Sequence, residues 1–162
     1  MMTKVFLLLV GLAAIFVWWS SGAMPELVAS HFGPGGIADA FMPRETYARL
    51  MVALVLLVPS LVYFASRSAK RLPASLINLP NKAYWLAPER QAASLASLGR
   101  FGAVVACATA LLLCLVHGMV MQANRIQPPH LEMMPLIGVL VLFFAMLVVA
   151  MAVFLGRFFR AP

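Results

Sequence analysis

Charged side chains are scarce in this sequence, and acidic side chains are the scarcest. Only 10% of the 162 residues are charged, and five acidic residues stand against twelve lysines and arginines. Soluble domains carry about 25% charged and about 45–50% apolar residues, whereas this chain is 64% hydrophobic. In water such a fold would expose large apolar patches. The composition therefore predicts a single compact bundle embedded in a lipid bilayer.

Motifs for catalysis, metal binding by thiols and nucleic-acid binding are also missing. The sequence has no zinc-protease motif, hydrolase elbow or phosphate-binding loop, and its few acids are too scattered to form a catalytic pair. Cys107 and Cys114 lie in one apolar run without CxxC spacing, which indicates small buried hydrophobes. No basic patch with interleaved aromatics stands apart from the apolar runs, so no nucleic-acid partner is expected. We therefore predict that the protein is not an enzyme.

Four apolar runs are long enough to cross the hydrocarbon core, which needs roughly 20 residues per helix. They cover residues 5–22, 47–65, 101–121 and 134–155, and none shows strand-like alternation. We predict an all-α integral membrane protein, a four-helix transmembrane bundle. Residues 23–46 and 122–133 would form outer loops, and residues 66–98 a cytoplasmic loop lying along the headgroups. The small residues of the third run, such as Ala106 and Ala110, favour close helix packing.

The distribution of lysine and arginine predicts how the bundle is oriented. Nine of the twelve basic residues flank or lie between the runs on one side, namely Lys4, Arg67, Lys70, Arg71, Lys82, Arg90, Arg100, Arg157 and Arg160. Cytoplasmic loops carry the excess of basic residues. We therefore expect both termini and the middle loop to lie in the cytoplasm, an N-in/C-in topology in a bacterial inner membrane.

Two loop segments carry unusual residue patterns. The first is the outer stretch from Met24-Pro25-Glu26 to Asp39, which includes His31-Phe32-Gly33 and Gly35-Gly36. Its glycines permit backbone conformations with positive φ, so the chain can turn tightly there. The second segment, residues 78–90, contains Asn78, Pro80, Asn81, Tyr84, Trp85, Glu89 and Arg90. Its prolines would bound a short turn or helix, and its aromatic side chains would anchor it at the interface.

Together the two segments resemble a family of uncharacterised bacterial membrane proteins. That family carries a small domain of the "LP…HF…G…D" type after its first transmembrane helix, and its larger relatives are similar to the immunity protein against the sporulation-delaying toxin. The resemblance covers residues 5–115, with departures at Met24, where the family usually has Leu, and at Ala83, where an acidic residue is common. The resemblance implies a membrane accessory, signalling or immunity-type protein.

Several roles remain open for the outer loop residues His31, Phe32, Gly33, Gly36 and Asp39. A histidine beside a carboxylate can bind a metal, move a proton or contact a ligand, or it can simply bond to backbone and fix the loop. We favour contact with a ligand or partner, either another membrane protein or a secreted peptide. The alternative is a structural small subunit of a larger membrane complex, and the sequence also leaves a homo-oligomer open.

A metal site at the outer face is the third hypothesis. His31, His117 and His130 all fall near that face, where thioethers and imidazoles together would suit copper, and imidazoles alone zinc. The methionines concerned are Met24, Met42, Met119, Met121, Met133 and Met134. Since methionine also fills apolar interfaces, we expect no cofactor in the first instance. His117 lies inside a span, where a polar side chain usually faces the bundle interior and bonds across helices.

Overall fold

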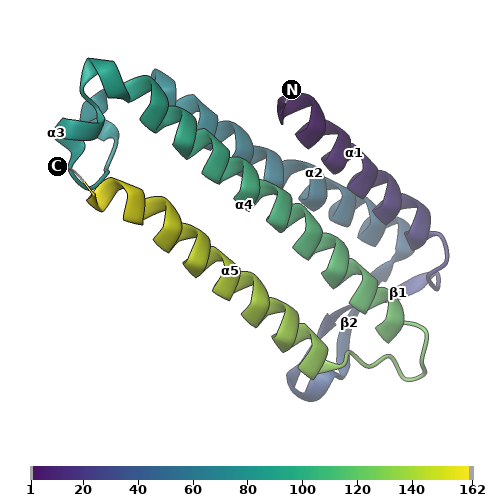
Figure 1. The fold of residues 1–162 in the computed structure, drawn as a ribbon. Coiled ribbons are helices and arrows are strands. Elements are labelled where there is room, and N and C mark those ends of the chain that lie inside the picture. The colour runs from purple at the N-terminus through teal and green to yellow at the C-terminus, as the bar shows by residue number, and fades with distance from the viewer. Residues whose placement is uncertain (1, 161–162) are drawn as a thin grey trace.

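The computed structural model describes residues 2–160 and shows long helices with a small β-hairpin at one end (Figure 1). The long helices are α1 (Met2–Ser21), α2 (Arg44–Ser68), α4 (Pro88–Ala123) and α5 (Met133–Phe159). Within residues 2–160, these four are the helices long and apolar enough to cross a membrane. The predicted all-α bundle with four candidate spans is therefore confirmed.

Two segments predicted as loops contain regular structure. In the first, β1 (Leu27–Phe32) pairs antiparallel with β2 (Ala38–Pro43) across the short 3-10 turn η1 (Pro34–Gly36). In the second, the chain passes through η2 (Ala69–Arg71), η3 (Ala74–Leu76) and the single-turn helix α3 (Lys82–Trp85). A short turn or helix between Pro80 and Pro88 was predicted, whereas the hairpin was not.

Helix α4 is much longer than its predicted span of residues 101–121. Pro88 stands in its first turn, where the fixed φ of proline suits a helix start. Its 36 residues make a helix about 54 Å long, well beyond the hydrocarbon core of about 30 Å. Residues 88–98, predicted to lie flat along the headgroups, instead continue the helix. The prediction failed because these residues mix polar side chains with alanine and leucine, so they favour helix without forming the continuous apolar run that hydropathy detects.

Helices α1, α2 and α4 form the packed core of the bundle. Small side chains on α4, among them Ala106 and Ala110, are fully buried and let the neighbouring helices approach closely. Phe6 of α1 stacks on Tyr63 of α2 with ring centroids 4.1 Å apart. Helix α2 continues through Pro59, which lacks the N–H of an ordinary helical residue. The close packing expected of the small residues in the third span is therefore present.

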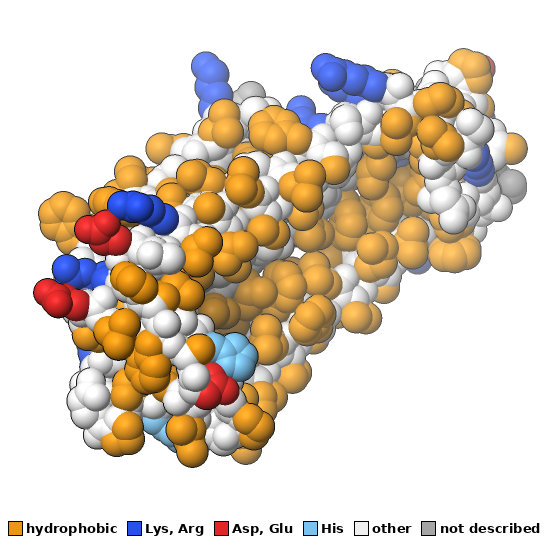
Figure 2. All heavy atoms as spheres, turned by 180° about the vertical axis from the view of Figure 1, so that it is seen from behind, with side chains coloured by type: hydrophobic (Ala, Val, Ile, Leu, Met, Phe, Trp, Pro, Cys, Tyr) orange, Lys and Arg blue, Asp and Glu red, His pale blue; other side chains and the backbone are white. Residues whose placement is uncertain are grey.

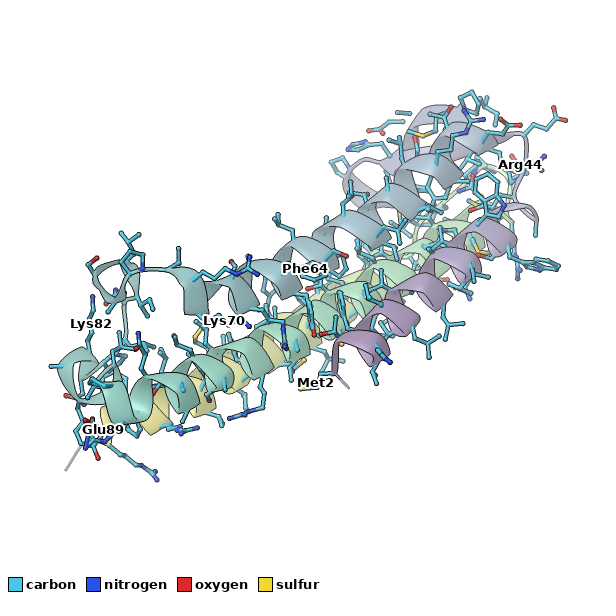
Figure 3. All side chains as sticks on the ribbon, turned by 90° about the horizontal axis from the view of Figure 1, so that it is seen from above. Met2, Arg44, Phe64, Lys70, Lys82 and Glu89 are labelled. Atoms are coloured by element: carbon cyan, nitrogen blue, oxygen red, sulfur yellow. The ribbon has the colours of Figure 1, made fainter. Side chains whose placement is uncertain are left out.

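Helix α1 covers only part of the length of its neighbours. Figure 3 shows Met2 beside the middle of the long helices, near Phe64, with Lys70 and Lys82 lying farther along. Thr3 accepts a hydrogen bond from the Tyr63 hydroxyl at 3.0 Å, which fixes where α1 begins against α2. The half of the molecule that holds α3 and the start of α4 therefore extends past α1.

Helix α5 runs beside α4, on the side away from α1 (Figure 1). Phe158 is its one buried residue. Near that end, Phe154 stacks on Phe101 of α4 with ring centroids 4.7 Å apart. An apolar cleft of about 210 Å³ separates the middles of the two helices, between Leu112 and Phe143. The aromatic packing of α5 against α4 is thus concentrated near the C-terminal end of α5.

Candidate functional site

The outer hairpin brings His31 and Asp39 together. The two strands are irregular on either side of His31, where the register shifts twice, so that His31 faces Ala40 and Phe32 faces Ala38. Such bulges redirect side chains, and here they allow residues of opposite strands to meet. His31 Nδ1 and Asp39 Oδ1 lie 2.5 Å apart, with 70% and 51% of the side chains exposed. The histidine and the carboxylate predicted to be neighbours are in direct contact.

At two positions of the hairpin, neighbouring groups lie so close to the backbone that only glycine fits. A Cβ on Gly33 would lie 2.9 Å from Asp39 Oδ2, so glycine makes room for the carboxylate. Gly36 has φ +83°, and a Cβ there would overlap the carbonyl of Leu131. The Leu131 N–H donates to the Gly36 carbonyl at 2.8 Å. Gly36 therefore joins the hairpin to the loop between α4 and α5, while Phe32 packs against the core.

Asn124 fixes the hairpin to the end of α4, and sequence reasoning missed it. The Ala29 N–H donates to Asn124 Oδ1 at 2.7 Å, and Asn124 Nδ2 donates to the Ala29 carbonyl at 3.0 Å. Both residues are buried. Arg44 adds a second attachment, since its guanidinium donates to the Met24 carbonyl at 2.9 Å. The only sequence signal for Asn124 was an amide three residues beyond the predicted apolar span of residues 101–121.

His117 lies at a buried junction of α1, α2 and α4. Its Nε2 is 2.8 Å from Ser20 Oγ, and its Nδ1 is 3.0 Å from the Tyr47 hydroxyl. Ser20 Oγ also lies 2.6 Å from the Phe16 carbonyl, which accepts the single hydroxyl proton. Every donor and acceptor of this hydrogen-bond network is then satisfied if His117 Nε2–H donates to Ser20 Oγ and the Tyr47 hydroxyl donates to His117 Nδ1. The expected bonding across helices is present, whereas Ser20 and Tyr47 were not foreseen as its partners.

The three histidines proposed as metal ligands do not form a common site. Both ring nitrogens of His117 are engaged inside the bundle, and Nδ1 of His31 is held by Asp39. Across residues 2–160 no three histidine, cysteine or acidic side chains gather as a metal site would require. His130 instead lines a separate cleft beside Met119 and Glu132. The predicted combination of His31, His117 and His130 is therefore not formed.

The segment from Asn78 to Arg90 caps the C-terminal end of α5. Asn81, in the left-handed region with φ +50°, donates from Nδ2 to the Phe158 carbonyl at 2.9 Å and to the Phe159 carbonyl at 3.3 Å. Trp85 Nε1 donates to the same Phe158 carbonyl at 2.9 Å. Carbonyls in the last helical turn lack intrahelical partners. These side chains therefore hold the end of α5 in place.

The charged residues of this segment contact aromatic and backbone groups rather than one another. Arg90 stacks over the Tyr84 ring at 4.0 Å from its centroid, and Lys82 donates to the Ser75 carbonyl at 2.9 Å. Glu89 is exposed in the first turn of α4, where a carboxylate suits the helix dipole. Glu89 pairs with neither Arg90 nor Lys82 among the ion pairs of residues 2–160. Asn78 is exposed and Pro80 half-buried.

Comparison of the chain with protein-family models, curated proteins and solved structures gives no match. The fold itself defines the class: a multi-pass, all-α membrane protein. One end carries a hairpin with an exposed histidine–aspartate pair, and the other end carries a capping segment for the last helix.

Proposed function

We propose that this chain is a non-enzymatic accessory, signalling or immunity-type protein of the bacterial inner membrane. In this proposal both termini lie in the cytoplasm and the hairpin of residues 27–43 faces outward. The hairpin contacts another membrane protein or a secreted peptide. The resemblance of the two loop segments to the immunity-related family supports this class.

The charge distribution supports the proposed orientation. Arg67, Lys70, Arg71, Lys82 and Arg90 belong to the end that holds α3, opposite the hairpin. Figure 2 shows acidic and histidine side chains at the hairpin end of the visible face, interspersed with a few basic ones, and apolar side chains covering the length between the two ends. Because basic residues concentrate on the cytoplasmic side of membrane proteins, the hairpin end is the outward one.

The observation that carries the proposed contact is a fixed hairpin with an exposed recognition surface. The buried Asn124 bonds and the Gly36–Leu131 contact hold its backbone, while the His31–Asp39 pair stays exposed. The same hairpin also exposes apolar side chains, namely Leu27, Ile37 and Phe41. A preformed surface of this kind loses little entropy on binding. Mixed apolar and charged groups suit an amphipathic peptide or a membrane-protein loop.

Site-specific photocrosslinking in bacterial membranes tests the proposal. A photoreactive residue at Ile37, which is 64% exposed, should crosslink to a defined partner. The same residue at the exposed Leu142 of α5 serves as the control. His31→Ala should abolish the Ile37 crosslink and, for an immunity-type protein, protection against the secreted peptide. A His31→Ala variant that crosslinks and protects like the wild type would overturn the proposal.

A second candidate function is that of a small subunit in a larger membrane complex. The observation in its favour is α5, which buries only Phe158 against the rest of the described chain. A subunit would present such a face to a neighbouring protein. Purification in mild detergent should then yield stoichiometric companions that are lost when Val141 and Val148, both exposed, are changed to Trp. Crosslinking at Ile37 would be unaffected by these changes.

A further inference from the structure

We propose that the cleft between α1, α2 and α4 at the N-terminal end of α1 binds one anionic phospholipid. An acyl chain would lie in the cleft, and Arg67 and Arg100 would hold the phosphate. This inference does not depend on the function of the hairpin.

The cleft is apolar and has a clear origin in the packing. It measures about 330 Å³ and is lined by Val5, Phe6, Tyr63, Ala103, Val104 and Cys107, with Met2 at its edge. The ring of Tyr63 is fully buried because it stacks on Phe6 and bonds to Thr3. Ala103 is too small to fill the space opposite. Since α1 begins at this level, the cleft lies where α1 leaves the end of α2 and α4 uncovered.

Two arginines stand directly beyond the apolar lining. Arg67 follows Tyr63 by one helical turn on the same face of α2, and its guanidinium carbon lies 5.3 Å from the centroid of the Tyr63 ring. Arg100 precedes Val104 by one turn on the same face of α4 and is exposed. Both cations therefore lie on the same side of the cleft, toward the end that holds α3.

No acidic side chain neutralises these arginines within residues 2–160. The ion pairs there are His31–Asp39 and Glu45–Arg49, both in the hairpin half of the molecule. Glu89 is on α4 but eleven residues from Arg100, a rise of about 16 Å. Guanidinium groups bind phosphate through paired charge-assisted hydrogen bonds. The charges beside the cleft thus complement a phosphate.

The size of the cleft favours an acyl chain over a partner helix. A helix about 10 Å across with a pitch of 5.4 Å occupies roughly 420 Å³ per turn, more than the 330 Å³ of the cleft. A narrow alkyl chain enters such a space without displacing the packed helices. An apolar slot with cations at its mouth also matches the order of chain and headgroup in a lipid leaflet.

Native mass spectrometry of the full chain, exchanged into detergent with defined phospholipids, tests the site. The wild type should retain one phosphatidylglycerol in about tenfold preference to phosphatidylcholine, because the choline ammonium offsets the phosphate charge of phosphatidylcholine beside two arginines. This factor corresponds to about 1.4 kcal/mol. Arg67→Gln combined with Arg100→Gln should remove this preference. Arg125→Gln, which changes an exposed arginine at the opposite end, should leave it unchanged. Gln keeps helix propensity, and circular dichroism verifies folding.

A second variant tests the apolar part of the site with both arginines present. Val104→Phe fills the cleft from an exposed position and should reduce phosphatidylglycerol retention to the level of phosphatidylcholine. Equal retention of the two lipids by the wild type would overturn the proposal. So would a preference that survives the double arginine variant or Val104→Phe, or a preference lost equally in Arg125→Gln. A dimer without bound lipid would assign the cleft to a second copy instead.

Discussion

At the scale of single residues, Asn124 is the side chain on which the position of the hairpin depends most. It is buried and pairs with both the N–H and the carbonyl of Ala29. Asn124→Ala would leave two buried backbone groups without partners, at a cost of about 2–4 kcal/mol in unfolding free energy. Unfolding in detergent measures the loss, and hydrogen exchange should show faster exchange of the Ala29 amide. Gln122→Ala removes an exposed amide two residues earlier in the chain and serves as the control.

Gly35 and Gly36 form a natural pair for separating backbone conformation from steric fit. Both have positive φ, but a Cβ on Gly35 meets nothing within 4 Å, whereas one on Gly36 overlaps the Leu131 carbonyl. Gly35→Ala should cost about 1–2 kcal/mol from backbone strain alone. Gly36→Ala should cost more because the loop between α4 and α5 must move. Thermal unfolding of the two variants measures the difference in stability. Equal losses of stability would contradict a close contact between Gly36 and Leu131.

The sequence indicates some of these residues and conceals others for a physical reason. His31 and Asp39 are close in the chain and separated by glycines, so a turn that joins them is foreseeable. Ser20, Tyr47 and His117 come from three different helices. Their meeting depends on helix rotation and depth, which no local pattern specifies. The same holds for Asn124 and Ala29, which are distant in sequence.

At the scale of elements, hydropathy predicts the long helices but not the hairpin. The four spans are recognisable because each is apolar over about 20 residues. The strand Leu27–Phe32 has no regular alternation in burial and contains a register shift. A two-stranded hairpin is marginally stable alone, and here its stability comes from contacts with α4 and the α4–α5 loop. The sequence of residues 23–46 alone does not predict those contacts, because their partners lie far away in the chain.

The cap on α5 gives a prediction at the element scale. Asn81→Gly keeps the positive φ but removes the hydrogen bonds to the Phe158 and Phe159 carbonyls. The last turn of α5 should then fray, with faster hydrogen exchange in residues 154–159. Asn81→Ala should fray equally and also lose about 1–2 kcal/mol of global stability from backbone strain. Asn78→Ala, at a nearby exposed asparagine, should change neither; unaltered exchange in Asn81→Gly would disprove the cap.

At the scale of the whole molecule, the proposed orientation is testable by labelling intact cells. In a background with Cys107→Ala and Cys114→Ala, single cysteines replace Ile37 in the hairpin end or Leu76 at the other end. These sites are matched in exposure, at 64% and 69%. A membrane-impermeant maleimide should label Ile37→Cys in intact cells and Leu76→Cys only after lysis. This result is expected because the excess of basic residues lies beside Leu76, which places that end in the cytoplasm. The reverse labelling pattern would show the opposite topology.

The sparse packing of the middle of α5 against α4 affects which substitutions the protein accepts. Helix α4 buries Ala106 and Ala110 against two neighbours, so larger side chains there force the core apart. The centre of α5 meets α4 only across a cleft and buries nothing. Substitutions between residues 137 and 150 should therefore be accepted whenever they remain apolar. As related sequences diverge from this chain, most positions of α5 should vary, while the length and hydropathy of the helix are kept. Its C-terminal turn around Phe158 should also be kept, because Asn81 and Trp85 bond to it.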